Sequence, residues 1–199
     1  MDWSRIISLN GNNNEGYPSF TRSGNHIGQV WKQRCNTITG DTTINSLGDF
    51  AIIVMGGNYI GTNKVYNPSV GNYISITGTF SSVPAGTFIY KYGYSTGHSW
   101  GYVQQSSVTV QYSDPITGLN TYYVRGLYKS YMQNSSGTDA VGAGDSGGCV
   151  YLNDGSYKIH GNVSGLSQPP AGSATHIMYS SPIYFAIDPQ NVGFTPKTN

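Results

Sequence analysis

This chain has few charged residues, two cysteines and no long hydrophobic run, and each shortage excludes a class of protein. Charged residues make up 10% of the 199 positions, with 10 basic residues against 9 acidic ones. Because no basic block exists, we expect neither nucleic acid nor an anionic membrane surface as a partner. No apolar stretch reaches the length of about 18 residues that a membrane-spanning helix needs. The N-terminus also lacks a basic region followed by an apolar run, so no signal peptide is predicted.

The two cysteines, Cys35 and Cys149, are too few for a disulfide scaffold. They could form one disulfide, but two buried free thiols are the favoured interpretation. No cluster of histidine, cysteine and aspartate has the spacing of metal ligands. We therefore expect neither a metal nor a cofactor.

Glycine and tyrosine are abundant, with 27 and 17 residues. Few segments show helical periodicity, and this profile favours an all-β protein with many turns. Turn signals separate short strand candidates at about the 8–12-residue spacing of a barrel or sandwich. These candidates cover 27–33, 49–55, 72–80, 87–93, 100–105, 107–113, 120–128, 148–152, 157–165 and 175–187. The stretch SPIYFAIDPQ (181–190) is expected to form a short helix.

Residues 144–148 read GDSGG and directly precede an apolar strand. A serine hydroxyl attacks a carbonyl only when a base takes its proton, and the resulting oxyanion needs hydrogen-bond donors. Glycine at 144 allows the N–H groups of Gly144 and Ser146 to point toward one place, and the missing side chains at 147 and 148 let a substrate approach. The alternative is a glycine-rich turn that happens to hold Asp145 and Ser146.

Several stretches resemble the chymotrypsin-like serine proteases, in particular the branch of α-lytic protease and the streptogrisins. GDSGG is similar to their nucleophile motif, which implies Ser146 as the nucleophile and the N–H groups of Gly144 and Ser146 as the oxyanion hole. GDFAIIV resembles the strand start that holds the catalytic aspartate, here Asp49. GYSTGHSWGYV (93–103) is similar to the signature that opens the second barrel. The motifs occur in the family's order.

The stretch YVRGLY (123–128) resembles the segment whose arginine, in this branch, pairs with the aspartate before the nucleophile. A buried Asp145 carboxylate is costly without a cation. The resemblance therefore implies an ion pair between Asp145 and Arg125.

Substrate-binding residues are implied in two places. HGNVSG (160–165) resembles the strand that binds an extended substrate backbone, which implies Val163, Ser164 and Gly165, with the Ser164 hydroxyl near Asp49. The segment 135–143 is expected to form a wall of the specificity pocket. Its residues Ala140 and Val141 suggest an apolar pocket, although Asp139 would favour a basic side chain if it pointed inward.

The base of the triad has no counterpart among these motifs, because no stretch matches the family's histidine motif. The chain has four histidines, and only His26 precedes Asp49. His26 is the candidate base, although a structural or surface role is the alternative for it and is expected for the other three, His98, His160 and His176. With 48 residues before Asp49, the first barrel is expected to lack its opening strands.

The predicted fold is thus a trypsin-like pair of antiparallel six-stranded β-barrels, the first incomplete at 1–80 and the second at 81–199, with a short C-terminal helix. The predicted function is peptide-bond hydrolysis through an acyl-enzyme on Ser146. The alternatives are an inactive homologue or fragment without a base, and a secreted β-rich peptide-binding module. We expect a monomer that acts on a peptide or protein, and the resemblance implies an extracellular location.

Overall fold

The structure is a computed structural model in which nearly every element is a β-strand, as predicted. It describes residues 18–20, 26–34, 44–55, 62–67, 70–80, 82–113, 121–152, 154–167 and 175–187.

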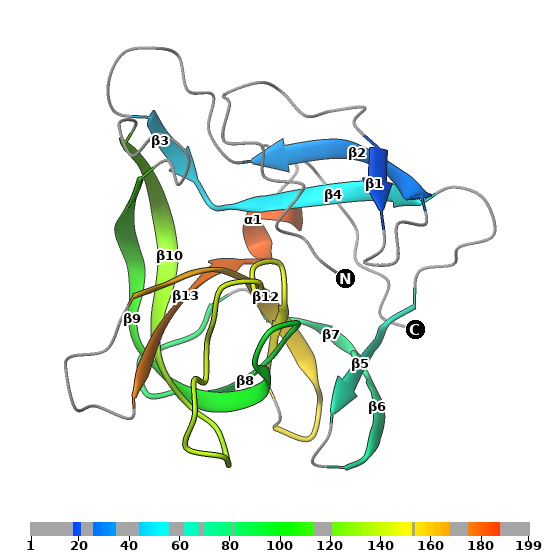
Figure 1. Cartoon of the computed structure of the whole chain (residues 1–199), viewed down its shortest axis with the longest axis vertical. Helices are drawn as coiled ribbons and strands as arrows, with labels where there is room; N and C mark the ends of the chain where they lie inside the picture. Colours follow the sequence, from blue (N-terminus) through cyan, green and yellow to red (C-terminus); the bar gives the residue numbers. More distant parts are fainter. Residues whose placement is uncertain are drawn as a thin grey trace.

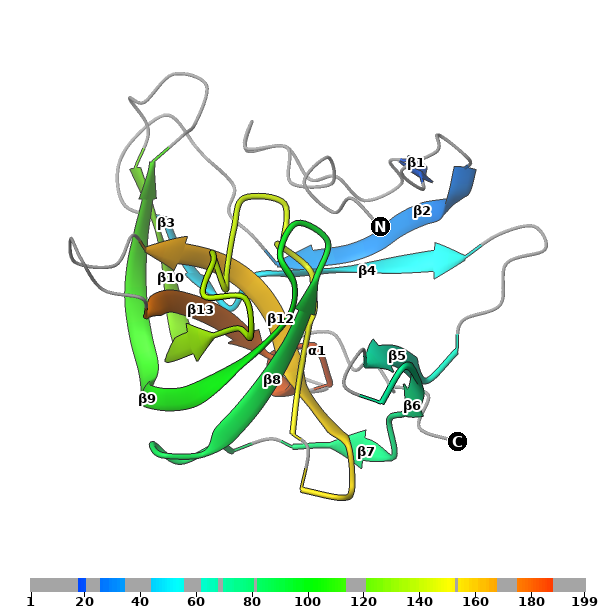
Figure 2. The ribbon, with the colours of Figure 1, turned by 60° about the horizontal axis from the view of Figure 1, so that its bottom comes forward.

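Six antiparallel strands of the C-terminal part close into a barrel-like ring, seen in Figure 2. They follow the order β11–β8–β9–β10–β13–β12, and β11 also pairs with β12, which closes the ring. This ring is the second barrel that the sequence predicts. Its strands are β8 (Phe88–Gly93), β9 (Gly97–Ser113), β10 (Thr121–Gln133), β11 (Cys149–Tyr151), β12 (Lys158–Ser167) and β13 (His176–Pro182).

The strand period of two residues places alternate side chains inside this ring. Along β8, Ile89 and Lys91 are fully buried, whereas Tyr90 between them is only partly buried. The largest core cluster consists of Val83, Ile89, Val103, Tyr128, Met132, Ala140, Val141, Val150, Leu152, Val163 and Met178.

Strand β9 joins two strand candidates that the sequence separates, 100–105 and 107–113. Ser107 has a φ of +56°, and the register against β10 shifts on either side of Leu127, which pairs with Val108. Gly126 on the partner strand has a φ of +77°. The polar residues at 106–107 therefore mark a β-bulge within one long strand and not a turn between two strands.

The N-terminal part forms a smaller sheet beside the ring (Figure 1). Three strands make up that sheet in the order β1–β2–β4, and a hairpin of β5 and β6 follows. Their bounds are β1 (Pro18–Phe20), β2 (His26–Arg34), β4 (Phe50–Met55), β5 (Lys64–Asn67) and β6 (Asn72–Ser75).

Two short strands of the N-terminal part join the second sheet. Strand β3 (Ile44–Leu47) pairs in parallel with β10, and β7 (Gly78–Thr79) pairs in parallel with β12. Backbone hydrogen bonds therefore connect the two parts on both sides of β4. The domain boundary near residue 80 remains a prediction.

The predicted short C-terminal helix is confirmed as α1 (Tyr184–Ile187), which directly follows β13. The N–H groups of Ala186 and Ile187 donate to the Ile183 carbonyl, and Phe185 and Ala186 are buried. No helix in the described part of the chain is long and apolar enough to cross a membrane.

Candidate active site

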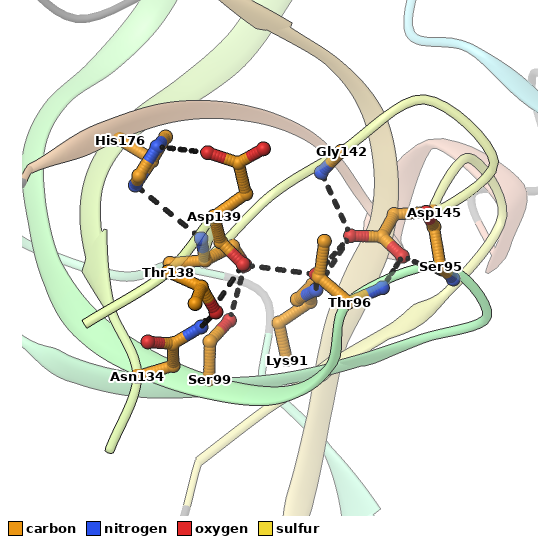
Figure 3. Close-up of polar contacts among 11 residues, drawn as sticks. Lys91, Ser95, Thr96, Ser99, Asn134, Thr138, Asp139, Gly142, Asp145 and His176 are labelled. Atoms are coloured by element: carbon orange, nitrogen blue, oxygen red, sulfur yellow. Dashed lines mark hydrogen bonds and ion pairs between the residues drawn. The ribbon is translucent and has the colours of Figure 1, made fainter. Parts of the chain in front are cut away.

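Asp145 is fully buried and its carboxylate accepts five hydrogen bonds, most of them visible in Figure 3. The Lys91 ammonium donates to Oδ2 at 2.6 Å, and the Thr96 hydroxyl donates to the same oxygen at 2.5 Å. The N–H groups of Ser95 and Thr96 donate to Oδ1 at 2.8 and 3.0 Å. The Gly142 N–H donates to Oδ2 at 3.0 Å. A buried carboxylate needs such donors and a cation, and here the cation and all the donors except Gly142 come from β8 and the turn after it.

The predicted ion pair between Asp145 and Arg125 is therefore wrong. The cation on Asp145 is Lys91, which is also fully buried. Arg125 is exposed on β10, where its carbonyl accepts the Gly48 N–H at 3.0 Å. Lys91 occupies an inward position of β8 in direct contact with Asp145, whereas Arg125 is exposed to solvent.

The pKa values of both groups in this buried pair are lowered. Burial lowers the pKa of Lys91, although its hydrogen bond and ion pair with Asp145 oppose the shift. Burial by itself would raise the pKa of Asp145, but the hydrogen bonds from Lys91 and Thr96 and the charge of Lys91 outweigh it and lower that pKa. Asp145 is therefore a structural carboxylate that stays ionised, and not a proton donor.

In the described part of the chain, the loop from Gly142 to Gly148 holds backbone N–H groups without a partner, including those of Gly144 and Ser146. The Asp145 N–H donates to the Gly142 carbonyl, and the Gly148 N–H donates to the Asp145 carbonyl. The N–H groups of Gly144 and Ser146 donate to no other group in the described part of the chain. Gly144 has a φ of +96°, which favours glycine. These unpaired donors are the groups that an oxyanion hole requires.

Glycine is required on both sides of Asp145. A Cβ on Gly148 would lie 2.7 Å from the Tyr92 carbonyl oxygen and 2.8 Å from that of Asp145. A Cβ on Gly93 would collide with the Asp145 carboxylate. Gly93 opens the stretch similar to the second-barrel signature, so part of that motif leaves room for the buried carboxylate.

Asp49 lies just before β4 and is held by groups from the second barrel. Its N–H donates to the Ser181 hydroxyl at 2.9 Å, and its Oδ2 accepts from the Ser164 hydroxyl at 2.6 Å. The Asn162 amide donates to its main-chain carbonyl at 3.1 Å. Gly48, with a φ of +76°, allows the turn that leads into Asp49. The predicted contact between Ser164 and Asp49 is therefore confirmed.

Strand β12 connects Asp49 with the Ser146 loop. The main chain of Val163 accepts the Gly147 N–H at 2.8 Å and donates to the Gly148 carbonyl at 2.9 Å. The next residue, Ser164, bonds Asp49. One peptide step along β12 thus joins the loop of the candidate nucleophile to the candidate triad aspartate. A β-sandwich in which GDSGG is only a turn would not bring these segments together.

The register of β12 explains why Ser164 faces Asp49. Val163 pairs with Ser180 and Gly165 with Tyr179, so Ser164 is an extra residue that has no partner on β13. Such a bulge re-aims a side chain and is frequent beside active sites. Here it sends the Ser164 hydroxyl to Asp49.

Three of the implied substrate-binding residues are buried. Ala140, Val141 and Val163 are at most 3% exposed and belong to the core cluster of the second barrel. Asp139 has a side chain that is 79% exposed, and its Oδ1 lies 3.0 Å from His176 Nε2. Figure 3 shows the two side chains pointing toward each other. Asp139 does not point inward, so the argument from this residue for a basic substrate side chain does not hold.

The three histidines with described side chains contact neither Asp49 nor Ser146 through any hydrogen bond in that part of the chain. Burial, and after it the charge of nearby Lys91, lowers the pKa of His98. Burial lowers the pKa of His160 to about 4. His98 stacks on Tyr90, with ring centroids 5.3 Å apart. His160 packs edge-on against Tyr128, with centroids 4.6 Å apart. His176 accepts the Ala140 N–H at 3.3 Å and lies beside Asp139.

The backbone position of His26 separates it from Asp49. Arg34 pairs with Phe50, the neighbour of Asp49, and His26 lies eight residues further along β2. At the rise per residue of an extended strand, the backbone of His26 lies roughly 25 Å from that of Arg34. This backbone position counts against His26 as the base.

Sequence reasoning missed the roles of Lys91 and Thr96. Lys91 carries a usable signal, since it lies in phase with Ile89 on a strand whose other phase is aromatic. A lysine in the inward phase of a strand needs a buried anion. Thr96 belongs to the signature stretch, but nothing in that stretch identifies its partner.

Among the described residues, no group of histidine, cysteine, aspartate and glutamate side chains could hold a metal ion.

Comparison with known proteins gives matches at the level of structure only. No protein-family model matches the sequence, and no curated protein is similar to it. The structure of Cellulomonas bogoriensis chymotrypsin matches with a TM-score of 0.62 at 21% identity, over 94% of this chain and 88% of that one. Thermobifida fusca protease A and Nocardiopsis protease each match with a TM-score of 0.56 at 20% identity, over 87% of this chain and 92% and 87% of theirs. The chain therefore has the fold of the bacterial chymotrypsin-like serine proteases.

Proposed function

We propose that this chain carries out serine endopeptidase-type hydrolysis of peptide bonds through an acyl-enzyme on Ser146. The observation that carries the proposal is the pair of unpaired N–H groups at Gly144 and Ser146, in a loop that β12 connects to Asp49. The fold shared with bacterial serine proteases supports a peptide or protein substrate and an extracellular location.

In this mechanism the Ser146 hydroxyl attacks the scissile carbonyl while a base takes its proton. The N–H groups of Gly144 and Ser146 donate to the oxyanion of the tetrahedral intermediate. The C–N bond then breaks, the amine leaves with the proton from the base, and water hydrolyses the ester on Ser146. The main chain of Ser164 and Gly165 is the proposed binding edge for the substrate backbone, because that of Val163 already bonds Gly147 and Gly148.

A second candidate function is the binding of extended peptides without cleavage. It is favoured by the positions of the histidines, because the three described side chains lie elsewhere and His26 is at the far end of β2. Ser146 without a base would retain only the residual catalysis that an oxyanion hole and substrate binding supply.

Labelling with a fluorophosphonate, with and without added imidazole, tests both candidates. The probe reacts at a serine that has an oxyanion hole and a base, and imidazole from solution can replace a missing base. Ser146→Ala is the control that must abolish labelling. Intact mass spectrometry measures the extent of the reaction.

Three outcomes decide the matter. Stoichiometric labelling of Ser146 without imidazole supports endopeptidase chemistry, which cleavage of a denatured protein substrate would then confirm. Labelling only with imidazole shows a formed site without its base and favours the peptide-binding function. The absence of labelling under both conditions overturns the nucleophilic role of Ser146.

A further inference from the structure

The Ser164 hydroxyl lies between two oxygen atoms from different parts of the chain. It donates to Asp49 Oδ2 at 2.6 Å, and the Tyr112 hydroxyl lies 3.1 Å from its oxygen. Ser164 and Asp49 are 7% and 8% exposed, so little water competes for these bonds. Tyr112 comes from the end of β9, 52 residues before Ser164.

The chemistry of the three groups sets the direction of both bonds. An ionised carboxylate only accepts hydrogen bonds, so the single proton of the Ser164 hydroxyl is used on Asp49. The Ser164 oxygen can then only accept from Tyr112, whose phenolic O–H is the donor. The result is a relay in which Tyr112 donates to Ser164 and Ser164 donates to Asp49. Successive bonds that run in one direction polarise and strengthen one another.

Gly165 makes this arrangement possible. A Cβ on Gly165 would lie 2.6 Å from the Tyr112 hydroxyl oxygen and 2.7 Å from a ring carbon. Any side chain there would push the phenol away from Ser164. The bulge at Ser164 turns its hydroxyl toward Asp49, and the glycine after it lets the phenol approach from behind.

We propose that Tyr112 is a positioning residue, which fixes the Ser164 hydroxyl as a donor and thereby lowers the basicity of the Asp49 carboxylate. The relay itself does not depend on catalysis. Its consequence for catalysis rests on the proposed function, because the carboxylate would orient an imidazole and stabilise its charged form.

Titration of the Asp49 side-chain carboxyl by 13C NMR tests the relay in the full-length protein without any substrate. Asp49→Asn assigns the signal. Tyr112→Phe removes only the donor hydroxyl, and we expect the titration midpoint of Asp49 to rise by roughly half a pH unit. Tyr179→Phe is the matched control, because this tyrosine packs in the same small cluster as Tyr112 without bonding Ser164.

Gly165→Ala provides a second, independent perturbation. It should shift the midpoint in the same direction, and the variant carrying both changes should show no shift beyond that of Tyr112→Phe, because both act on one bond. The relay is overturned if Tyr112→Phe leaves the midpoint in place, or if Tyr179→Phe moves it equally. A separate failure of fluorophosphonate labelling would count against the proposed function alone, since the NMR titration requires no reaction at Ser146.

Discussion

The Lys91 ammonium and the Asp145 carboxylate form a fully buried ion pair at 2.6 Å, although 54 positions separate them in the sequence. The pair connects β8 with the loop that carries Ser146. Gly93 leaves room for the same carboxylate, and the N–H groups of Ser95 and Thr96 donate to it. The loop conformation therefore depends on β8 and the turn after it. An internal cation therefore holds the candidate oxyanion hole.

Removal of the Lys91 charge should strongly destabilise the fold. In Lys91→Met the Asp145 carboxylate stays buried without its cation, and we expect a loss of about 3–5 kcal/mol in the free energy of unfolding. Urea denaturation measures this loss. Arg125→Gln, on the exposed side of β10, should stay within about 0.5 kcal/mol of the wild type. Equal losses in the two variants would contradict the assignment of Lys91 as the partner of Asp145.

His160 should make the protein less stable in mild acid. Its pKa in the folded protein is about 4, below the ordinary value of 6.5, because the ring is buried. Between these values the unfolded chain binds a proton that the folded one does not, so this contribution is lost as the pH falls from about 7 to 4. The full effect is about 3 kcal/mol.

The variant His160→Gln isolates this effect, since it has no titrating ring. Urea denaturation at pH 7 and at pH 4 should show a smaller acid-induced loss of stability in the variant than in the wild type. Identical losses in the two proteins would mean that His160 does not titrate with a lowered pKa.

Gly148 should tolerate no side chain. In Gly148→Ala the new methyl group would meet two backbone carbonyl oxygens at less than 3 Å, and backbone cannot move aside as a flexible side chain can. We expect a destabilisation of about 1–3 kcal/mol. Gly78→Ala is the control, because its nearest neighbour would be a Lys158 side-chain carbon at 3.7 Å. Thermal unfolding of the two variants should differ clearly, with Gly78→Ala close to the wild type.

The Cys149 thiol should be unreactive in the folded protein. It is free, and burial raises its pKa to about 12, so very little thiolate exists at pH 8. In a Cys35→Ser background, a thiol-specific disulfide reagent should detect no thiol in native buffer and one thiol in denaturant. Rapid labelling of the native protein would contradict the raised pKa of this thiol.

Local patterns in the sequence predicted the all-β class, most of the strands and the short helix, because alternation and turn residues are local signals. The contact between Ser164 and Asp49 was also anticipated, through the family resemblance. The ion pair on Asp145 was wrong because the partner of a buried charge depends on which side chain points inward. Lys91 carries a signal, since it lies in phase with Ile89 on β8, but nothing in that pattern identifies Asp145 as its partner.

Three further features depend on register, which a single sequence does not reveal. The bulge at Ser107 makes two strand candidates one strand, and the bulge at Ser164 turns a hydroxyl toward Asp49. The pairing of β2 with β4 places His26 at the end remote from Asp49. A shift of one residue in any of these pairings would exchange the faces of the strand.

The bonds from Ser164, Ser181 and Asn162 to Asp49 have a consequence for how this residue evolves. They fasten the N-terminal sheet to the second barrel at the start of β4. Of these three bonds only that from Ser164 uses the carboxylate, and this bond would favour an aspartate here even in a descendant that had lost its base and its catalysis. In this fold, Asp49 is a fastener between the two parts as well as a candidate member of a triad.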